Sequence, residues 1–215
     1  MARLARTLGH ADTTMTTPEQ DALDTQTHVA LGRFVVSFSS LLHNLETSTI
    51  HLLSPEPNGR QWLLLRAALA DRTASPIGSA FFSVFHKRWE GALTEDDIKI
   101  LKAMRRELDD LIKERNRLMH DAWMSTTKGA DQGPHALTRV RVRAHGSGVE
   151  YEAKAYPPTV LQTLVQDVDR LSSVVNGAVW YYRPGQSGPE LHIKMSVKDG
   201  KVHRNEPTAC APGVA

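Results

Sequence analysis

The sequence has one cysteine, Cys210, and no long apolar run among its 215 residues. A single thiol excludes a disulfide framework and a cysteine-ligated zinc site, and it fits a reducing compartment. No run approaches the roughly 20 apolar residues that a bilayer-spanning helix needs. Residues 1–15 also lack the apolar stretch of a secretory signal. These absences predict a soluble, cytoplasmic protein that makes no contact with a membrane.

An excess of charge of either sign is missing as well. The chain has 26 Lys and Arg against 24 Asp and Glu, which gives a net charge of +2. This balance does not by itself indicate nucleic-acid binding, so only local charge patterns can do so. Hydrophobic residues make up 40% of the chain, which is enough for one domain with a real core.

Apolar residues recur at helical spacing in several segments. A long helix is expected from Thr17 to about Ser54, because Thr17-Pro18 is a start signal and a proline-rich stretch ends the pattern. Two shorter helices are expected at about 60–72 and 76–90. A second long helix should run from Thr94 to about 124, and a last one from about 159 to 182.

Between the last two helices the pattern changes to alternation, which predicts a β-hairpin over about 137–156 with a turn at Gly146-Ser147. The predicted fold class is therefore mainly α, a helical bundle with a β-hairpin inserted before the last long helix. Residues 1–16 are expected to be a flexible N-terminus and residues 17–182 the helical domain. Residues 183–215 are expected to be a partly disordered extension, in which Asp199-Gly200 favours a small hairpin.

The second long helix contains one apolar seam that is interrupted by a charge. Arg115 stands where the seam predicts an apolar residue. A buried guanidinium needs either a carboxylate partner, for which Glu46 of the first helix is the candidate, or a solvated cleft. The members of the seam are Leu101, Met104, Leu108, Leu111, Arg115, Leu118 and Ala122.

A second stripe runs beside this seam. Its members are Ile112, Asn116, Met119, His120 and Trp123. Two apolar stripes imply two packing partners, so one stripe is expected to face the bundle and the other a second copy of the chain.

Residues Glu114 to Trp123 contain Arg115-Asn116 followed by His120. This string resembles the signature of the HEPN superfamily, an arginine usually followed by asparagine, a histidine a few residues downstream and often a trailing tryptophan. The order of elements over about residues 17–182 resembles that family too. Asp121 departs from the pattern, because a small residue often follows the histidine there, and a carboxylate at this position is expected to oppose a phosphate.

The resemblance implies a helical bundle that dimerises so that two motifs share a cleft. In active members it implies a metal-independent endoribonuclease without a cofactor. RNA is the implied substrate, in a toxin or defence role, and an antitoxin or a nucleotidyltransferase-like protein is the implied partner besides a second copy.

The residues suit that chemistry, in which a ribose 2′-hydroxyl attacks the adjacent phosphate. His120 would exchange a proton with the attacking or the leaving oxygen. Arg115 would stabilise the charge that develops on the phosphate, and Asn116 would orient the phosphate or the histidine. Arg117 and Glu46 are candidate substrate-binding residues.

Three arginines alternate along the first strand of the expected hairpin and would share one face. They are Arg139, Arg141 and Arg143. Folding at the Gly-Ser turn places glutamates opposite Arg141 and Arg143, which neutralises both. Arg139 falls opposite Lys154, so it is expected to stay uncompensated and to be a further substrate-binding residue.

Two alternatives from other classes remain open. The polar residues of the motif can form a structural network near a helix end, where His120 is a favourable partner for the helix dipole, in a catalytically silent binding or dimerisation module. A nucleotide sensor would bind a nucleotide without turnover. A metal site is not expected, because the ten histidines include no pair four apart and no HExxH.

Overall fold

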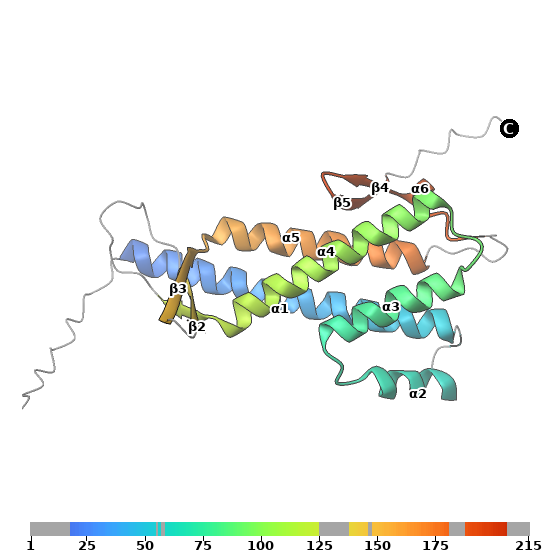
Figure 1. Cartoon of the computed structure of the whole chain (residues 1–215), viewed down its shortest axis with the longest axis horizontal. Coiled ribbons are helices and arrows are strands. Elements are labelled where there is room, and N and C mark those ends of the chain that lie inside the picture. Colours follow the sequence, from blue (N-terminus) through green and yellow to red (C-terminus); the bar gives the residue numbers. More distant parts are fainter. Residues whose placement is uncertain are drawn as a thin grey trace, which may run out of the picture.

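A computed structural model describes residues 18–54, 56, 59–124, 138–145, 148–180 and 188–205. The predicted flexible residues 1–16, the predicted helix start at Thr17 and the Gly146-Ser147 turn lie outside these ranges. Within them, α1 and α5 lie side by side, α3 packs against α1 and α4, and α4 also contacts α5 (Figure 1). The helices are α1 (Pro18–Leu53), α2 (Arg60–Leu69), α3 (Ala74–Arg88), α4 (Glu95–His120), α5 (Pro158–Trp180) and the short α6 (Leu191–Lys194).

Two small antiparallel sheets complete the described structure. The first has the order β1-β2-β3 and lies at the C-terminal end of α4, and the second pairs β4 with β5 (Figure 1). The strands are β1 (Ala122–Met124), β2 (Thr138–His145), β3 (Gly148–Ala155), β4 (Met195–Lys198) and β5 (Lys201–Arg204). The predicted mainly helical bundle with a hairpin before the last long helix is confirmed at this level. Among the described residues, no helix combines the length and the apolarity that crossing a bilayer requires.

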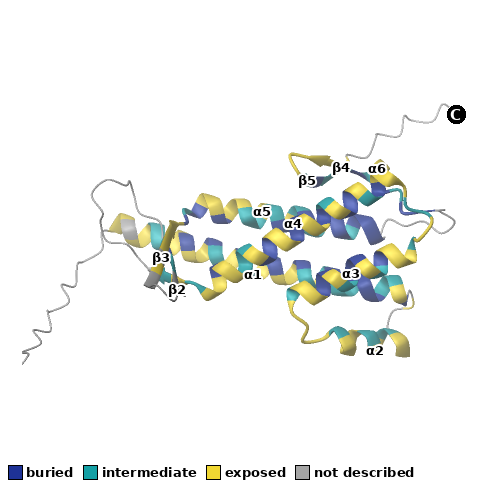
Figure 2. Cartoon of the chain, viewed as in Figure 1, coloured by how far each residue is buried: buried dark blue, intermediate teal, exposed yellow. Residues whose placement is uncertain are grey.

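The core forms where the predicted apolar spacing places one face of each long helix inward. Phe34, Phe38 and Leu41 of α1 and Phe81 and Phe85 of α3 are buried, as Figure 2 shows for the inner faces of the helices. Their three- and four-residue spacing keeps them on one face, and burying each side chain contributes about 1.5 to 3 kcal/mol. α5 adds residues to the same core, which are Leu161, Val168, Leu171, Val174 and Val175.

The hairpin has the predicted register. Arg141 pairs with Glu152 and Arg139 with Lys154 across β2 and β3. The end predicted for the second long helix is wrong by four residues, because α4 stops at His120 and Asp121 takes an extended conformation (φ −84°, ψ 154°). Residues after it form β1, in which Ala122 pairs with Val140 of β2.

The second stripe of α4 packs within its own chain at two of its five members, Ile112 and Trp123. Ile112 is buried. Trp123 lies edge-on against Tyr156 with ring centroids 5.6 Å apart, and its Nε1–H donates to the Leu118 carbonyl at 2.8 Å. Met119 remains 43% exposed. The prediction that this stripe faces a second copy is therefore wrong for Ile112, which belongs to the chain's own core, and Trp123 packs partly against the same core.

The segment 188–205 packs onto the bundle. Leu191, Met195 and Val202 are buried in the same core as the helices. The small hairpin predicted here is confirmed, with Asp199 and Gly200 at positive φ of 51° and 75° in its turn.

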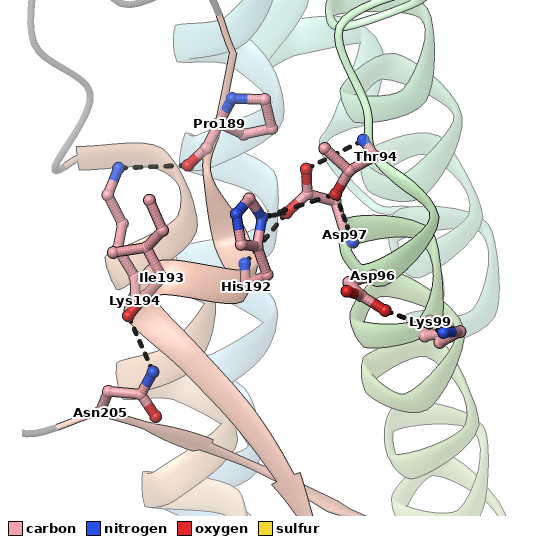
Figure 3. A network of polar contacts seen from close by, with 9 residues as sticks. All are labelled: Thr94, Asp96, Asp97, Lys99, Pro189, His192, Ile193, Lys194 and Asn205. Atoms are coloured by element: carbon pink, nitrogen blue, oxygen red, sulfur yellow. Dashed lines mark hydrogen bonds and ion pairs between the residues drawn. The ribbon is translucent and has the colours of Figure 1, made fainter.

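Polar contacts anchor this segment to the beginning of α4 (Figure 3). The Oδ1 atom of buried Asp97 accepts the His192 backbone N–H at 3.0 Å and lies 2.8 Å from His192 Nδ1. Thr94 and Asp97 also form a reciprocal capping box with both bonds at 3.1 Å. One carboxylate thus caps α4 and holds the C-terminal segment.

Candidate functional site

The last two turns of α4 carry the motif. Arg115 is half-buried, and its Nη1 donates to Asn116 Oδ1 at 3.2 Å. Asn116 and His120 are exposed, and they lie four residues apart, on one face of the helix. Within the described part of the chain, His120 makes no hydrogen bond or ion pair. Its ring is therefore open to solvent and to a ligand.

Arg115 is solvated rather than sealed in the bundle. In the described residues its hydrogen-bond partner is Asn116, and Glu46 of α1, which is partly buried, forms no hydrogen bond or ion pair with it. Of the two outcomes expected for a charge on the apolar seam, the structure has the solvated one. The guanidinium keeps its donors for an external anion.

The hairpin brings a cation to the end of α4. Asp121 Oδ2 lies 3.3 Å from Arg139 Nη1, and Asp121 Oδ1 lies 4.0 Å from Arg141 Nε. Arg139 Nη2 also donates to Glu152 Oε1 at 3.2 Å. The Arg139 side chain is only 3% exposed. The prediction that Arg139 stays uncompensated is wrong, because pairing of β1 with β2 places Asp121 beside it.

This arrangement also changes the role expected for Asp121. Its carboxylate faces two guanidinium groups, so it does not stand as a bare negative charge against a phosphate. Its contact with Arg139 is held by charge rather than by an aligned hydrogen bond, because Asp121 Oδ2 and Arg139 Nη1 have no hydrogen-bond partner among the described residues. Asp121 thus joins the helix end to the sheet.

A second cluster adjoins the first, because the Arg139 guanidinium lies over the Tyr156 ring at 5.4 Å from its centroid. The hydroxyl of buried Tyr156 donates to Glu114 Oε1 at 2.5 Å, and Arg117 Nη1 donates to Glu114 Oε2 at 3.1 Å. Burial acts to raise the pKa of Glu114, but the hydrogen bonds from Tyr156 and Arg117 outweigh it and hold that pKa below its usual value. Burial, followed by the neighbouring carboxylate, raises the pKa of Tyr156. At neutral pH Glu114 is ionised and Tyr156 is neutral.

A groove of about 610 Å³ lies between α4, α5 and the turn that joins β4 to β5. Its α4 wall includes Arg106, Lys113 and Arg117, so the groove extends alongside the helix turn that carries the motif. Arg115, Asn116 and His120 themselves do not line it. Most of the residues that line the groove are charged. Its charged lining residues are Arg106, Glu107, Asp110, Lys113, Glu114, Arg117, Asp167, Arg170, Asp199 and Lys201.

Sequence reasoning missed the supporting residues Glu114 and Tyr156. The available signal was a glutamate one residue before the motif and a tyrosine at the end of the hairpin, directly before Pro157-Pro158. The contact between them spans 42 positions, and no local pattern predicts it. Of the predicted substrate-binding residues, Arg117 lies at the site, Arg139 is buried behind it and Glu46 makes no polar contact with it in the described structure.

No group of three or more His, Cys, Asp or Glu side chains in the described ranges is arranged to hold a metal ion. Comparisons with models of protein families, with curated proteins and with solved structures found no match. The site is therefore interpreted from its own residues and geometry.

Proposed function

We propose that the protein is a metal-independent endoribonuclease in which Arg115, Asn116 and His120 are the catalytic residues. The observation that carries this proposal is the arrangement at the exposed end of α4. His120 forms no hydrogen bond or ion pair with any described residue, and it lies on the same helix face as Asn116, whose Oδ1 accepts a hydrogen bond from Arg115. The resemblance of this string to the HEPN signature supports it. The two guanidinium groups that face Asp121 also support it, because they reduce the repulsion that Asp121 would exert on a phosphate.

In the proposed reaction the ribose 2′-oxygen bonds to the adjacent phosphorus and the bond from phosphorus to the 5′-oxygen breaks. The products are a 2′,3′-cyclic phosphate and a 5′-hydroxyl. His120 exchanges a proton with one of these two oxygens. Arg115 stabilises the negative charge on the phosphate oxygens in the transition state, and Asn116 orients the arginine.

The proposal extends to a cytoplasmic homodimer with a toxin or defence role, and to an antitoxin or a nucleotidyltransferase-like protein as a partner. These parts rest on the family resemblance. Met119 is the apolar member of the second stripe that the chain leaves most exposed, and it is the residue we place at the dimer contact. Light scattering at micromolar concentration is expected to give the mass of a dimer, and the mass of a monomer would count against a shared cleft.

The test is cleavage of purified total RNA by the wild type and by His120→Ala. Loss of a proton-transfer histidine lowers a rate by about 10²- to 10⁴-fold. His86→Ala is the matched control, because His86 is also exposed near the end of a helix, α3. We expect products with 2′,3′-cyclic phosphate ends from the wild type and the control, in EDTA as without it.

Undiminished cleavage by a folded His120→Ala variant would contradict the catalytic role. RNA binding without cleavage by any variant would favour the silent binding module. Binding of a free nucleotide without turnover would favour the sensor.

A further inference from the structure

Cations line one exposed face of α4. At 100° per residue, five of them and His120 fall within an arc of about 60°. The row runs from Lys99 to His120, about 30 Å along the helix axis. Every member is exposed, and Figure 2 shows exposed residues following the outer side of α4. The members of this row, here named the α4 stripe, are Lys99, Lys102, Arg106, Lys113, Arg117 and His120.

Two cations of the α4 stripe have no competing partner among the described residues. Lys102 and Arg106 form no hydrogen bond or ion pair within that part of the chain. The other three each pair with an acid three residues away on the same helix, at 2.8 Å for Lys99, 2.9 Å for Lys113 and 3.1 Å for Arg117. The pairs of Lys99 and Lys113 are exposed on both sides and weak because water and salt screen them, so a phosphate can replace the acid there, whereas Glu114, the partner of Arg117, is only 16% exposed.

The groove beside the α4 stripe has its inner carboxylates already neutralised. Arg170 Nη2 lies 2.5 Å from Glu107 Oε2, and Lys201 Nζ lies 2.6 Å from Asp167 Oδ2. Arg106, Lys113 and Arg117 form the α4 side of the same groove. The turn with Asp199 and Lys201 forms the opposite wall.

We propose that the α4 stripe binds the backbone of single-stranded RNA and leads the strand to His120. The inference rests on the proposed function, because it assigns the binding surface for the same substrate. One straight row of cations matches one phosphate backbone, and its length accommodates several nucleotides of an extended strand. A single strand also has the freedom to align its 2′-oxygen with the bond to the 5′-oxygen, which in-line attack requires. The exposed lysines and arginines would contact the phosphate backbone, so binding would not depend on the base sequence.

The test is binding of a 2′-O-methylated RNA oligomer, which cannot be cleaved because its nucleophile is blocked. The stripe variant is Lys102→Gln with Arg106→Gln. The matched control also removes two charges, in Arg33→Gln with Arg105→Gln, since both arginines are exposed and lie outside the α4 stripe, Arg33 on α1 and Arg105 at 100° from Arg106 on α4. Fluorescence anisotropy over a salt series gives both the affinity and its salt dependence, and circular dichroism checks the helix content.

We expect the stripe variant to bind about tenfold more weakly, and the control to bind like the wild type. The slope of log affinity against log salt should fall by about 0.7 for each phosphate that the variant no longer neutralises. Equal weakening in the stripe variant and the control would overturn the inference, since only net charge would then matter. Unchanged binding in the stripe variant, or binding of an acidic protein in place of RNA, would overturn it as well.

Failure of the proposed function has a different outcome. If the nuclease proposal fails, no variant cleaves RNA, while the stripe variant still binds the methylated oligomer more weakly than the control does. If the α4 stripe fails alone, cleavage depends on His120 and the stripe variant binds and cleaves like the wild type.

Discussion

Arg115 and His120 differ in how far their side chains are buried. Arg115 is half-buried on the seam, and His120 is exposed at the end of α4. Changes at exposed positions are usually within about 0.5 kcal/mol of neutral, whereas a half-buried arginine also loses the packing of its stem. We therefore expect His120→Ala to abolish cleavage with almost no change in melting temperature, and Arg115→Ala to abolish cleavage with a small decrease. Calorimetry and RNA product analysis on both variants check this order, and a larger decrease for His120→Ala would indicate a structural role at the helix end.

Tyr156→Phe tests the network behind the motif. Glu114 has a pKa below its usual 4.5, so it contributes stability above that pH and loses the contribution as pH falls through the folded-state pKa. Removing the hydroxyl leaves a partly buried carboxylate one hydrogen bond short, which costs about 1 to 3 kcal/mol near neutral pH. Urea unfolding over a pH series should show that the difference in free energy of unfolding between the variant and the wild type becomes smaller below pH 4.5. Glu114→Gln is the control, because its side chain does not titrate. A loss of unfolding free energy in Tyr156→Phe that does not change with pH would contradict the role of the Tyr156 hydroxyl in stabilising ionised Glu114.

At the scale of the helices, two glycines make a matched pair. A Cβ on Gly78 of α3 would lie 2.6 Å from Leu108 Cδ2, whereas a Cβ on Gly32 of α1 would meet nothing within 4 Å. Alanine in place of glycine within a helix gains about 0.5 to 1 kcal/mol. Gly32→Ala should therefore stabilise the protein. Gly78→Ala should destabilise it by about 1 to 3 kcal/mol, because buried Leu108 has to move. Urea unfolding decides the sign of each change, and a stabilised Gly78→Ala would show that α3 and α4 separate easily.

The beginning of α4 depends on one buried carboxylate. Burial acts to raise the pKa of Asp97, but the hydrogen bonds from His192 and Thr94 outweigh it, so the pKa lies below 3.8. Its stabilising contribution is therefore present above pH 3.8 and is lost as pH falls through the folded-state value. Asp97→Ala should cost about 2 to 4 kcal/mol near neutral pH, since a cap and the partner of the His192 N–H are both lost.

Asp96→Ala is the matched control, because its pair with Lys99 is exposed to solvent and contributes little to stability. Hydrogen exchange should show faster opening of residues 188–205 in Asp97→Ala and not in Asp96→Ala. Equal exchange in the two variants would mean that this segment is held by its apolar contacts alone.

Local patterns predicted most helices and the hairpin register, for physical reasons. Alternation and a Gly-Ser turn fix which residues face one another, so the pairing of Arg141 with Glu152 follows from the sequence. The end of α4 does not follow from it, because β1 has only three residues and forms by pairing with β2, which starts at Thr138. The same long-range pairing brings Asp121 to Arg139. Site residues on one helix could thus be predicted together, but their supports on distant strands could not.

At the scale of the whole molecule, the segment 188–205 completes the bundle. Glu107 of α4 is buried. Its carboxylate accepts one hydrogen bond from the Val202 backbone N–H and one from Arg170 Nη2 of α5. Arg170 in turn donates to the Val202 carbonyl at 2.5 Å. A buried ion pair of this kind is tolerated only where hydrogen bonds satisfy its remaining atoms, and here the backbone of β5 supplies two of them. The stability of α4 and α5 is thereby coupled to residues that the sequence pattern assigned to an extension.

Truncation after Tyr182 tests this coupling. It removes Leu191, Met195 and Val202, whose burial contributes about 1.5 to 3 kcal/mol each. It also leaves Glu107 without a backbone donor. Because whole domains are stable by only about 5 to 15 kcal/mol, we expect the truncated chain to unfold at a much lower temperature or without cooperativity. Truncation after Asn205 is the control, since it removes no residue of the described core, and it should melt like the full chain. Equal melting of all three chains by calorimetry would show that the bundle is complete without the C-terminal segment.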